Sequence, residues 1–252
     1  MRAATKPLLL FAVVVAFTLP AAGQYISPVA QGARSGALGG SLLYDCEAQG
    51  AAVDWRRDYG LAALADKTVR LQLHTGASGT ALAAYSHRGD AVYHEQQVAL
   101  GYGLRLTSWL HAAVAARWLL RGTNDAHYER RQWLAPSALL QAYTGNTTVT
   151  LLAGTRPWDE ARPWRMHLQA ASRPLPQLLT LAEVEREERT RLRLGMEYTI
   201  VEGWLLRSGL ATRPVVLTFG VGARRQHWSV DLAVEVHDAL GITPQTTVAL
   251  WF

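Results

Sequence analysis

The closing stretch of the chain, residues 228–252, restricts the fold more than any other stretch. From Trp228 to Val236 every second residue is apolar, and the positions between them include Asp231 and Glu235. A period of two places these two sets of side chains on opposite faces of a β-strand. The stretch therefore predicts a closing β-hairpin with one apolar face and one charged face.

The same alternation recurs along the chain from Lys67 onward. Residues 190–200, for example, alternate apolar side chains with arginine, glycine and glutamate, and turn residues such as 144–146 separate one run from the next. Together with one strand near residues 41–44, these runs predict about 14 antiparallel strands. A membrane β-barrel, a soluble β-sandwich and a lipocalin-like barrel all share this pattern.

Two features favour the membrane barrel over the soluble folds. Most of the tryptophans, and the C-terminal Phe252, fall at the ends of the expected strands, where membrane barrels carry girdles of aromatic side chains. Ionisable side chains that face lipid at mid-depth cost roughly 2–4 kcal/mol each, so the charged faces must line the lumen. We therefore predict an all-β fold, an antiparallel transmembrane β-barrel whose apolar side chains face lipid.

The residues predicted to face the lumen are the ionisable ones at alternating strand positions. Arginine and carboxylate side chains on neighbouring strands can satisfy one another there. Two roles stay open for this set, a structural network that fills a narrow barrel and a binding track for an anionic or amphipathic solute. The set comprises Arg70, Arg105, Arg117, Arg191, Arg193, Glu197, Arg207, Arg224, Asp231 and Glu235.

The chain begins with a predicted secretory signal peptide at residues 1–23. Arg2 and Lys6 precede a short apolar run, and small residues follow that run, which is the order found in cleaved export signals. The apolar run is shorter than the roughly 20 residues that a membrane-spanning helix needs. We therefore expect an exported protein that resides in the outer membrane.

Residues 24–66 are predicted to form an N-terminal segment that holds the first strand and partly plugs the barrel, which itself spans residues 67–252. Residues 32–40 are rich in glycine and alanine and lack the period of a strand, so they suit tight packing inside a larger structure. A flexible linker is the alternative interpretation of this segment.

Patterns that indicate catalysis are missing from the sequence. It contains no nucleophile elbow, phosphate-binding loop or paired-histidine zinc motif, so we predict no enzyme, catalytic residue, metal or cofactor. His127 could bind a metal together with Asp125 and Glu129, but a solvated loop is the preferred interpretation.

Cys46 is the only cysteine, which excludes an internal disulfide. No basic run interleaves with aromatic residues, so nucleic acid is not expected as a partner.

The chain resembles two kinds of Bacteroidota outer-membrane barrel, the PorV/PorQ-like barrels of type IX secretion and the barrels related to long-chain fatty-acid transporters. The resemblance is carried by the small-residue segment at 32–40, the hairpin repeat, and the closing segment that includes 219–222 and 236–241. The chain departs from those families at residues 44–51, where they usually continue with an Asn-Pro-Ala-Gly stretch.

The resemblance and the barrel pattern together imply a passive transporter or channel-like barrel for a small hydrophobic or amphipathic ligand. The alternatives are a non-transporting scaffold or shuttle of a type IX-like secretion system and a soluble periplasmic binding protein. Val248, Leu250 and Phe252 match the terminal assembly signal of such barrels. The expected partners are therefore outer-membrane lipid and the barrel assembly machinery, with a hydrophobic ligand or secretion-system components in addition.

Overall fold

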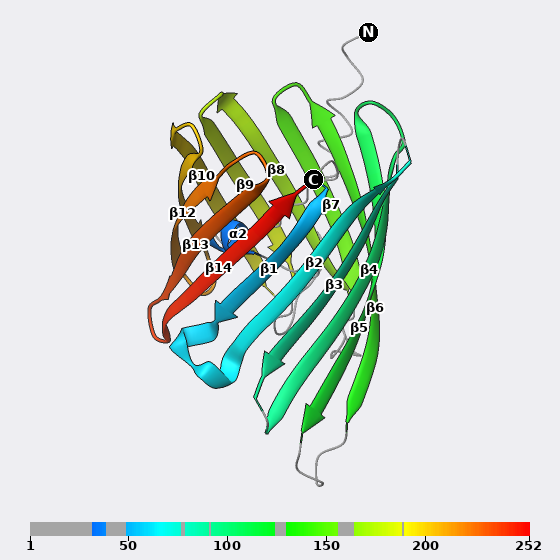
Figure 1. Cartoon of the computed structure of the whole chain (residues 1–252), viewed down its shortest axis with the longest axis vertical. Helices are drawn as coiled ribbons and strands as arrows, with labels where there is room; N and C mark the ends of the chain where they lie inside the picture. The colour runs from blue at the N-terminus through cyan, green and yellow to red at the C-terminus, as the bar shows by residue number, and fades with distance from the viewer. Residues whose placement is uncertain are drawn as a thin grey trace.

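The strands of the chain close into one antiparallel barrel, as the alternation predicts (Figure 1). The structure is a computed structural model that describes residues 32–38, 49–76, 79–90, 92–123, 130–155, 164–187 and 189–252. Within these ranges each strand pairs with its sequence neighbours, and β1 pairs with β14 to close the ring of 14 strands. The strands are β1 Gly50–Arg57, β2 Ala65–Thr75, β3 Gly79–Gly89, β4 Tyr93–Arg105, β5 Leu110–Thr123, β6 Arg131–Thr144, β7 Thr147–Thr155, β8 Trp164–Leu175, β9 Leu178–Arg186, β10 Thr190–Val201, β11 Trp204–Ala211, β12 Val216–Arg224, β13 Trp228–His237 and β14 Gly241–Trp251.

The first strand of the barrel lies later in the sequence than the run near 41–44. β1 begins at Gly50 and pairs with β14 on one side and with β2 on the other, so part of the predicted N-terminal segment belongs to the barrel wall. The run at 41–44 and the predicted signal peptide at 1–23 both lie outside the described residues. The described helical elements are α2 (Ala33–Ala37) and the short 3-10 turns η1 (Asp58–Gly60) and η2 (Ala62–Leu64); none of them is long and apolar enough to cross a membrane.

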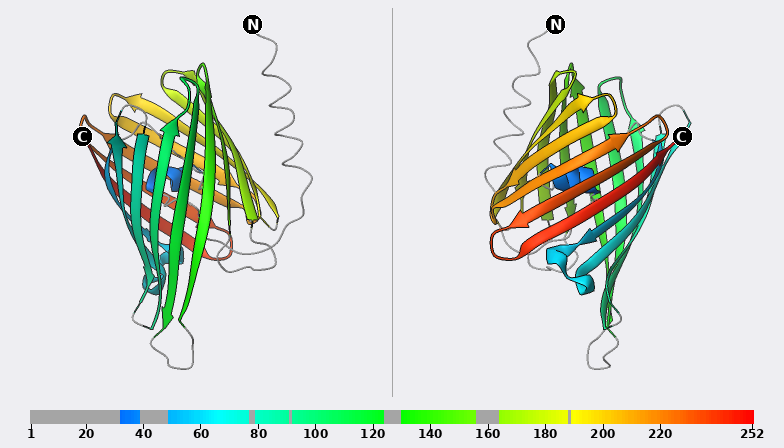
Figure 2. Two further views of the ribbon diagram at one scale, coloured as in Figure 1. Left: turned by 90° about the vertical axis from the view of Figure 1, so that its right-hand side faces the viewer. Right: turned by 60° about the vertical axis from the view of Figure 1, so that its left-hand side comes forward.

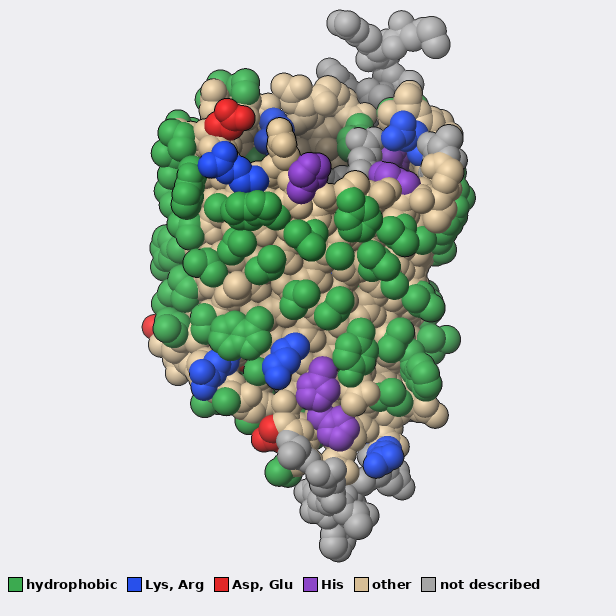
Figure 3. All heavy atoms as spheres, in the orientation of Figure 1, with side chains coloured by type: hydrophobic (Ala, Val, Ile, Leu, Met, Phe, Trp, Pro, Cys, Tyr) green, Lys and Arg blue, Asp and Glu red, His purple; other side chains and the backbone are tan. Residues whose placement is uncertain are grey.

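The apolar side chains of the strands point out of the barrel and the charged ones point in. Leu194 and Leu232 are 53% and 48% exposed, whereas Arg193 and Asp231 retain only 5% and 6% exposure. Figure 3 shows the resulting band of apolar side chains on the outer face. In a soluble barrel the apolar faces would form the core, so this arrangement supports the membrane barrel and its predicted orientation.

The two rims of the barrel differ in the length of their connections. One rim, here called the C-terminal rim, holds Phe252 and tight turns such as those at 144–147 and 201–204. The opposite or far rim holds the longer connections, including residues 57–65, which contain η1 and η2. Short turns on the periplasmic side and longer loops outside are characteristic of outer-membrane barrels.

The aromatic girdle is only partly as predicted. Trp164, Trp204 and Trp228 begin their strands and are well exposed on the outer face. Trp133 and Trp251, by contrast, occupy inward positions. Each shares a strand face with a buried residue two places away, Ala135 for Trp133 and Ala249 for Trp251. The sequence predicts that these two tryptophans lie near strand ends, but they face the lumen instead of joining the outward aromatic girdle.

Candidate functional site in the barrel lumen

The short helix α2 lies inside the ring of strands, against β12, β13 and β14 (Figure 2). The backbone N–H of Ala33 donates to Thr247 Oγ1 at 2.7 Å, and Thr218 Oγ1 donates to the carbonyl oxygen of Ala37 at 2.9 Å. Both ends of the helix are thus held by threonine hydroxyls of the wall. Ala37 and Leu38 are fully buried, so this segment packs tightly on the inner surface.

Glycines in the wall and in the helix make this close approach possible. A Cβ built on Gly220 would lie 2.5 Å from Ala37 Cβ, and one on Gly195 would lie 2.9 Å from the carbonyl oxygen of Leu38. On the helix itself, a Cβ at Gly36 would lie 2.3 Å from Gln245 Oε1. The small residues that mark this segment in the sequence therefore serve its contact with the wall.

A chain of ion pairs joins the helix to three strands. Arg34 of α2 donates two hydrogen bonds to Glu197 of β10, at 2.8 and 2.7 Å. Glu197 also accepts from Arg207 Nε of β11 at 2.7 Å, and Arg207 Nη1 contacts Asp231 Oδ1 of β13 at 2.6 Å. Arg207 is almost completely buried, so its positive charge is compensated by Glu197 and Asp231 within the lumen rather than by water.

A second ion pair lies beside the start of the helix. Arg70 of β2 donates to both oxygens of Asp54 on β1, at 2.6 and 2.9 Å. Thr247, which accepts from the N–H of Ala33, donates its own hydroxyl to Asp54 Oδ1 at 2.6 Å. The bonds from Arg70 to the helix therefore form one continuous polar path.

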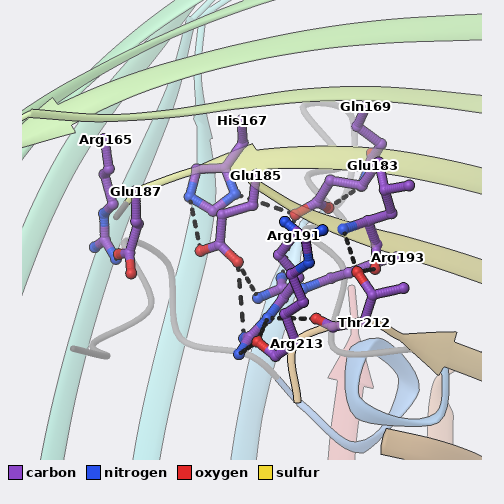
Figure 4. A network of polar contacts seen from close by, with 11 residues as sticks. Arg165, His167, Gln169, Glu183, Glu185, Glu187, Arg191, Arg193, Thr212 and Arg213 are labelled. Carbon is purple, nitrogen blue, oxygen red and sulfur yellow. Dashed lines mark hydrogen bonds and ion pairs between the residues drawn. The ribbon is translucent and has the colours of Figure 1, made fainter. Parts of the chain in front are cut away.

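A larger network lies on β8, β9 and β10 (Figure 4). Arg193 of β10 contacts Glu183 Oε1 at 3.1 Å and Glu185 Oε2 at 2.6 Å. His167 of β8 lies between the same two carboxylates, with Nδ1 3.1 Å from Glu183 and Nε2 3.6 Å from Glu185. Gln169 donates to the remaining oxygen of Glu183 at 3.1 Å. These side chains are all buried, and they fix one another in place.

This network continues toward the far rim through arginines. Arg191 donates to the backbone carbonyl of Arg213 from Nη2 at 2.9 Å, and its Nη1 lies 3.9 Å from Glu185 Oε2. A separate pair lies beside the network, with Arg165 Nη1 3.4 Å from Glu187 Oε1. From the sequence alone, the mixed charges at residues 183–189 predict the outer end of a hairpin. That interpretation is wrong for Glu183 and Glu185, which lie inside β9 and point into the lumen.

The far rim carries its own ion-pair cluster around the connection between β1 and β2. Asp58 of η1 accepts from Arg56 and from Arg88 of β3. Arg56 also contacts Glu235 Oε2 of β13 at 3.2 Å, and the N–H of Tyr59 donates to a threonine hydroxyl of β14. These bonds tie the connection to the inner wall instead of leaving it to extend outward.

The ten ionisable residues predicted to face the lumen all occupy inward strand positions. Arg105 and Arg224 are exposed at the C-terminal rim, where their strand partners His111 and Ser229 are buried and inward. Arg224 lies over the ring of Trp251, with 5.9 Å between the guanidinium carbon and the ring centroid. Arg70 and Arg191 are half-buried. The buried members are Arg117, Arg193, Glu197, Arg207, Asp231 and Glu235.

Another part of the inner wall is apolar. Leu139 of β6 and Leu152 of β7 pack together with Ala113 of β5. Leu179 and Leu181 of β9 are also inward and buried. Since β6 stands seven strands from β13 in the closed ring, this apolar strip faces the side of the lumen that carries Asp231 and Glu235. The interior is therefore mixed, with an apolar strip on β6 and β7 opposite the charged residues of β13.

Several members of the networks were not among the predicted residues. Asp54, Arg56, Arg34, His167 and Glu183 all make ion pairs in the lumen. Glu183 follows Leu179 and Leu181 at a spacing of two residues, and residues two apart share a strand face. This spacing is a sequence signal that could have placed Glu183 inward. Among the described residues no group of three or more histidine, cysteine, aspartate or glutamate side chains is placed to hold a metal. The loop with His127 lies outside those residues.

Comparisons with known proteins give a fold but no family. No family model and no curated protein matches the chain. Among solved structures, the toluene transporter TodX of Pseudomonas putida superposes with a TM-score of 0.63 at 11% identity, covering 93% of this chain and 98% of that one. The toluene transporter TbuX of Ralstonia pickettii gives a TM-score of 0.62 at 11% identity, covering 87% and 97%. The chain thus shares the barrel fold of these two transporters.

Proposed function

We propose that this protein is an outer-membrane barrel that allows the passive passage of a small hydrophobic or amphipathic molecule. The observation that carries the proposal is the mixed interior, in which Leu139 of β6 and Leu152 of β7 lie opposite the charged residues of β13. A molecule with an apolar body and a polar end would find partners on both sides. Pockets for such ligands are mostly apolar with a few placed polar groups.

The fold neighbours support the same class of ligand. TodX and TbuX, the two barrels of similar fold, are described as toluene transporters. The likeness concerns the fold, so a ligand of this kind is our inference from the interior. The absence of nucleophile motifs in the sequence, together with these neighbours, favours a transporter over an enzyme.

Export and assembly complete the proposal. We infer that the signal peptide at 1–23 directs export and that Val248, Leu250 and Phe252 present the assembly signal to the barrel assembly machinery. Supporting this role, these three side chains are exposed on the outer face at the C-terminal rim. The surrounding partner would be outer-membrane lipid.

The finer kinship with the PorV/PorQ-like and fatty-acid-transporter-like barrels of Bacteroidota is also a proposal. It is supported by the small-residue segment at 32–38, one of the features that carry the resemblance, which packs on the inner wall. A scaffold of a secretion system would be inert in uptake assays but would co-purify with other secretion components from its own cells.

An uptake assay in proteoliposomes tests the function. Vesicles that contain the folded full chain should take up toluene faster than protein-free vesicles, and a small hydrophilic sugar should not show the same gain. The double variant Leu139→Gln/Leu152→Gln should reduce the toluene gain, while the apolar control Leu139→Ile/Leu152→Ile should retain it. Equal uptake with and without protein would refute transport of this class.

A further inference from the structure

The outer face of the barrel carries a separate group of basic side chains at the far rim. Arg57 ends β1, Lys67 lies near the start of β2, His87 near the end of β3 and His94 near the start of β4. All four occupy outward positions, on the opposite side of the wall from the lumen networks. We call these four residues the outer basic patch. Figure 3 shows histidine and basic side chains gathered below the apolar band, over these strands.

The strand register places the members of the patch side by side. Lys67 is the direct partner of His87 in the β2–β3 ladder. The rings of His87 and His94 stack with centroids 6.2 Å apart and an angle of 7° between their planes. Arg57 pairs with Ala65 of β2. Ala65 lies two residues before Lys67, on the same outward face. Four neighbouring strands thus contribute one continuous surface.

The patch has no counter-charge on its own face. No outward position of β1, β2, β3 or β4 carries a carboxylate; Asp54, Asp66 and Glu95 all occupy inward positions. Within the described ranges, Arg57 Nε is buried without a hydrogen-bond partner, and the side chain of Lys67 makes no hydrogen bond or ion pair. The nearby Asp90 sits in the β3–β4 turn, where it accepts backbone N–H bonds from Val92 and Tyr93.

This isolation contrasts with the arginines on the other side of the same strands. Arg56, one residue before Arg57, contacts two carboxylates, and Arg70 of β2 forms a bidentate pair with Asp54. The strands therefore compensate their inward cations internally and leave the outward ones to the surroundings. Among the described residues no outward carboxylate of these four strands faces the patch, so it is open to negative charge from outside the barrel.

The position of the patch identifies the chemistry of that partner. One outward position further into the apolar band lie Trp55, Val69 and Tyr85, which are 38%, 53% and 44% exposed. Side chains at this boundary stand at the level of lipid headgroups. Clusters of basic residues at a membrane surface attract anionic headgroups, and arginine, lysine and imidazole N–H groups all donate to phosphate oxygens.

We propose that the outer basic patch binds the phosphate groups of lipids in the leaflet at the far rim. The acyl chains of such a lipid would lie along the apolar side chains of β1 to β4, and its phosphates would contact Arg57 and Lys67. This site lies on the outer wall and is independent of any molecule that passes through the lumen.

Native mass spectrometry of the folded full chain in detergent tests the site, with diphosphoryl lipid A as the probe. The protein should retain this lipid more strongly than phosphatidylcholine, with monophosphoryl lipid A between the two. Each basic side chain near an anionic surface contributes a factor of about five in affinity, so Arg57→Gln/Lys67→Gln should weaken retention by roughly 25-fold.

A charge-matched control separates local binding from overall charge. Arg173→Gln/Arg225→Gln removes two exposed arginines at the C-terminal rim and should leave lipid A retention unchanged. Equal losses in the two double variants, or equal retention of lipid A and phosphatidylcholine by the unaltered protein, would overturn the proposal. A shift in gel mobility between unheated and boiled samples checks that each variant is folded.

A labelling experiment on the unaltered protein covers the case in which a variant does not fold. Beyond the predicted signal peptide Lys67 is the only lysine, so acetylation of its amine is read directly from the mass of one peptide. Diphosphoryl lipid A should slow this acetylation, and phosphatidylcholine should not. Equal rates with both lipids would contradict the proposal. Neither experiment measures passage through the lumen, so failure here leaves the transport proposal to its own test.

Discussion

Arg34 and Glu197 form a bidentate ion pair that joins the inner helix to the barrel wall, with N–O distances of 2.8 and 2.7 Å. Glu197 is shared with Arg207, which continues the contact to Asp231. The helix is only five residues long, so an isolated segment of this length would not be stable in water. Its position depends on these side-chain contacts and on the two threonine hydroxyls.

Removing the guanidinium of Arg34 should loosen the helix without unfolding the barrel. In Arg34→Ala, Glu197 keeps its bond to Arg207, so its charge stays compensated while the helix loses its ion pair. We expect faster passage of small solutes in a liposome-swelling assay and faster cleavage of the N-terminal segment by added protease. Arg173→Ala at the C-terminal rim is the control and should change neither. An unaltered swelling rate in Arg34→Ala would show that the helix does not restrict passage.

Enlarging Gly195 should displace the same segment by a steric route. A Cβ at this position already comes within 2.9 Å of the carbonyl oxygen of Leu38 and 3.0 Å of its Cβ, so Gly195→Leu cannot coexist with the present position of the segment. The variant should match Arg34→Ala in swelling and protease sensitivity. Gly101→Ala is a control, since its nearest contact is Ala115 Cβ of the neighbouring strand at 3.2 Å. Wild-type behaviour of Gly195→Leu would argue that Leu38 does not lie on β10.

The buried carboxylate of Glu183 should matter far more to stability than an exposed one. It accepts from Arg193, Gln169 and His167, and loss of one partner from a buried ion pair costs about 3–5 kcal/mol. Because Arg193 keeps Glu185, we expect Glu183→Gln to lose about 3 kcal/mol, the lower end of that range. Urea unfolding in detergent measures the loss. Glu202→Gln, in the exposed turn between β10 and β11, should lose little; equal effects in both variants would contradict the buried network.

Much of the barrel could be predicted because strand alternation is a local property of the sequence. The closing hairpin, the strands from β2 onward and the inward position of residues such as Arg193 and Asp231 all follow from a period of two. The first strand was harder to recognise. β1 begins with Gly50, Ala51 and Ala52, which give no apolar contrast, and only Val53 and Trp55 around Asp54 mark its two faces.

The partners inside the lumen could not be predicted from local pattern. Arg34 meets Glu197 across 163 positions of the chain, and that pairing depends on where α2 rests on the wall. The sequence shows only that residues 32–38 are small, not which strands carry the glycines that receive them. The prediction for Glu183 and Glu185 is wrong for a related reason. A dense run of charges resembles a solvated turn until it is known which residues of the strand face inward.

Deleting Phe252 should impair assembly rather than the stability of the finished barrel. Its side chain is 63% exposed, and its N–H makes one long bond of 3.4 Å to the carbonyl oxygen of Gln49, so the folded wall loses little without it. We expect less heat-modifiable protein in the outer-membrane fraction of expressing cells but normal refolding of the purified chain into detergent. A normal amount of folded protein in the membrane would show that the terminal residue is not part of the assembly signal.

The central claim is that the apolar face of each strand meets lipid and the charged face lines the lumen. Quenching of an attached fluorophore by a quencher within the bilayer tests this claim most directly. In a Cys46→Ser background, bimane is attached to Leu140→Cys or Leu194→Cys, which lie on the exposed apolar face, or to Ser137→Cys, an inward position of β6. Nitroxide-labelled lipid should quench the probes at 140 and 194 strongly and the probe at 137 weakly. Strong quenching at 137 with little at 140 and 194 would contradict a barrel whose apolar faces meet lipid.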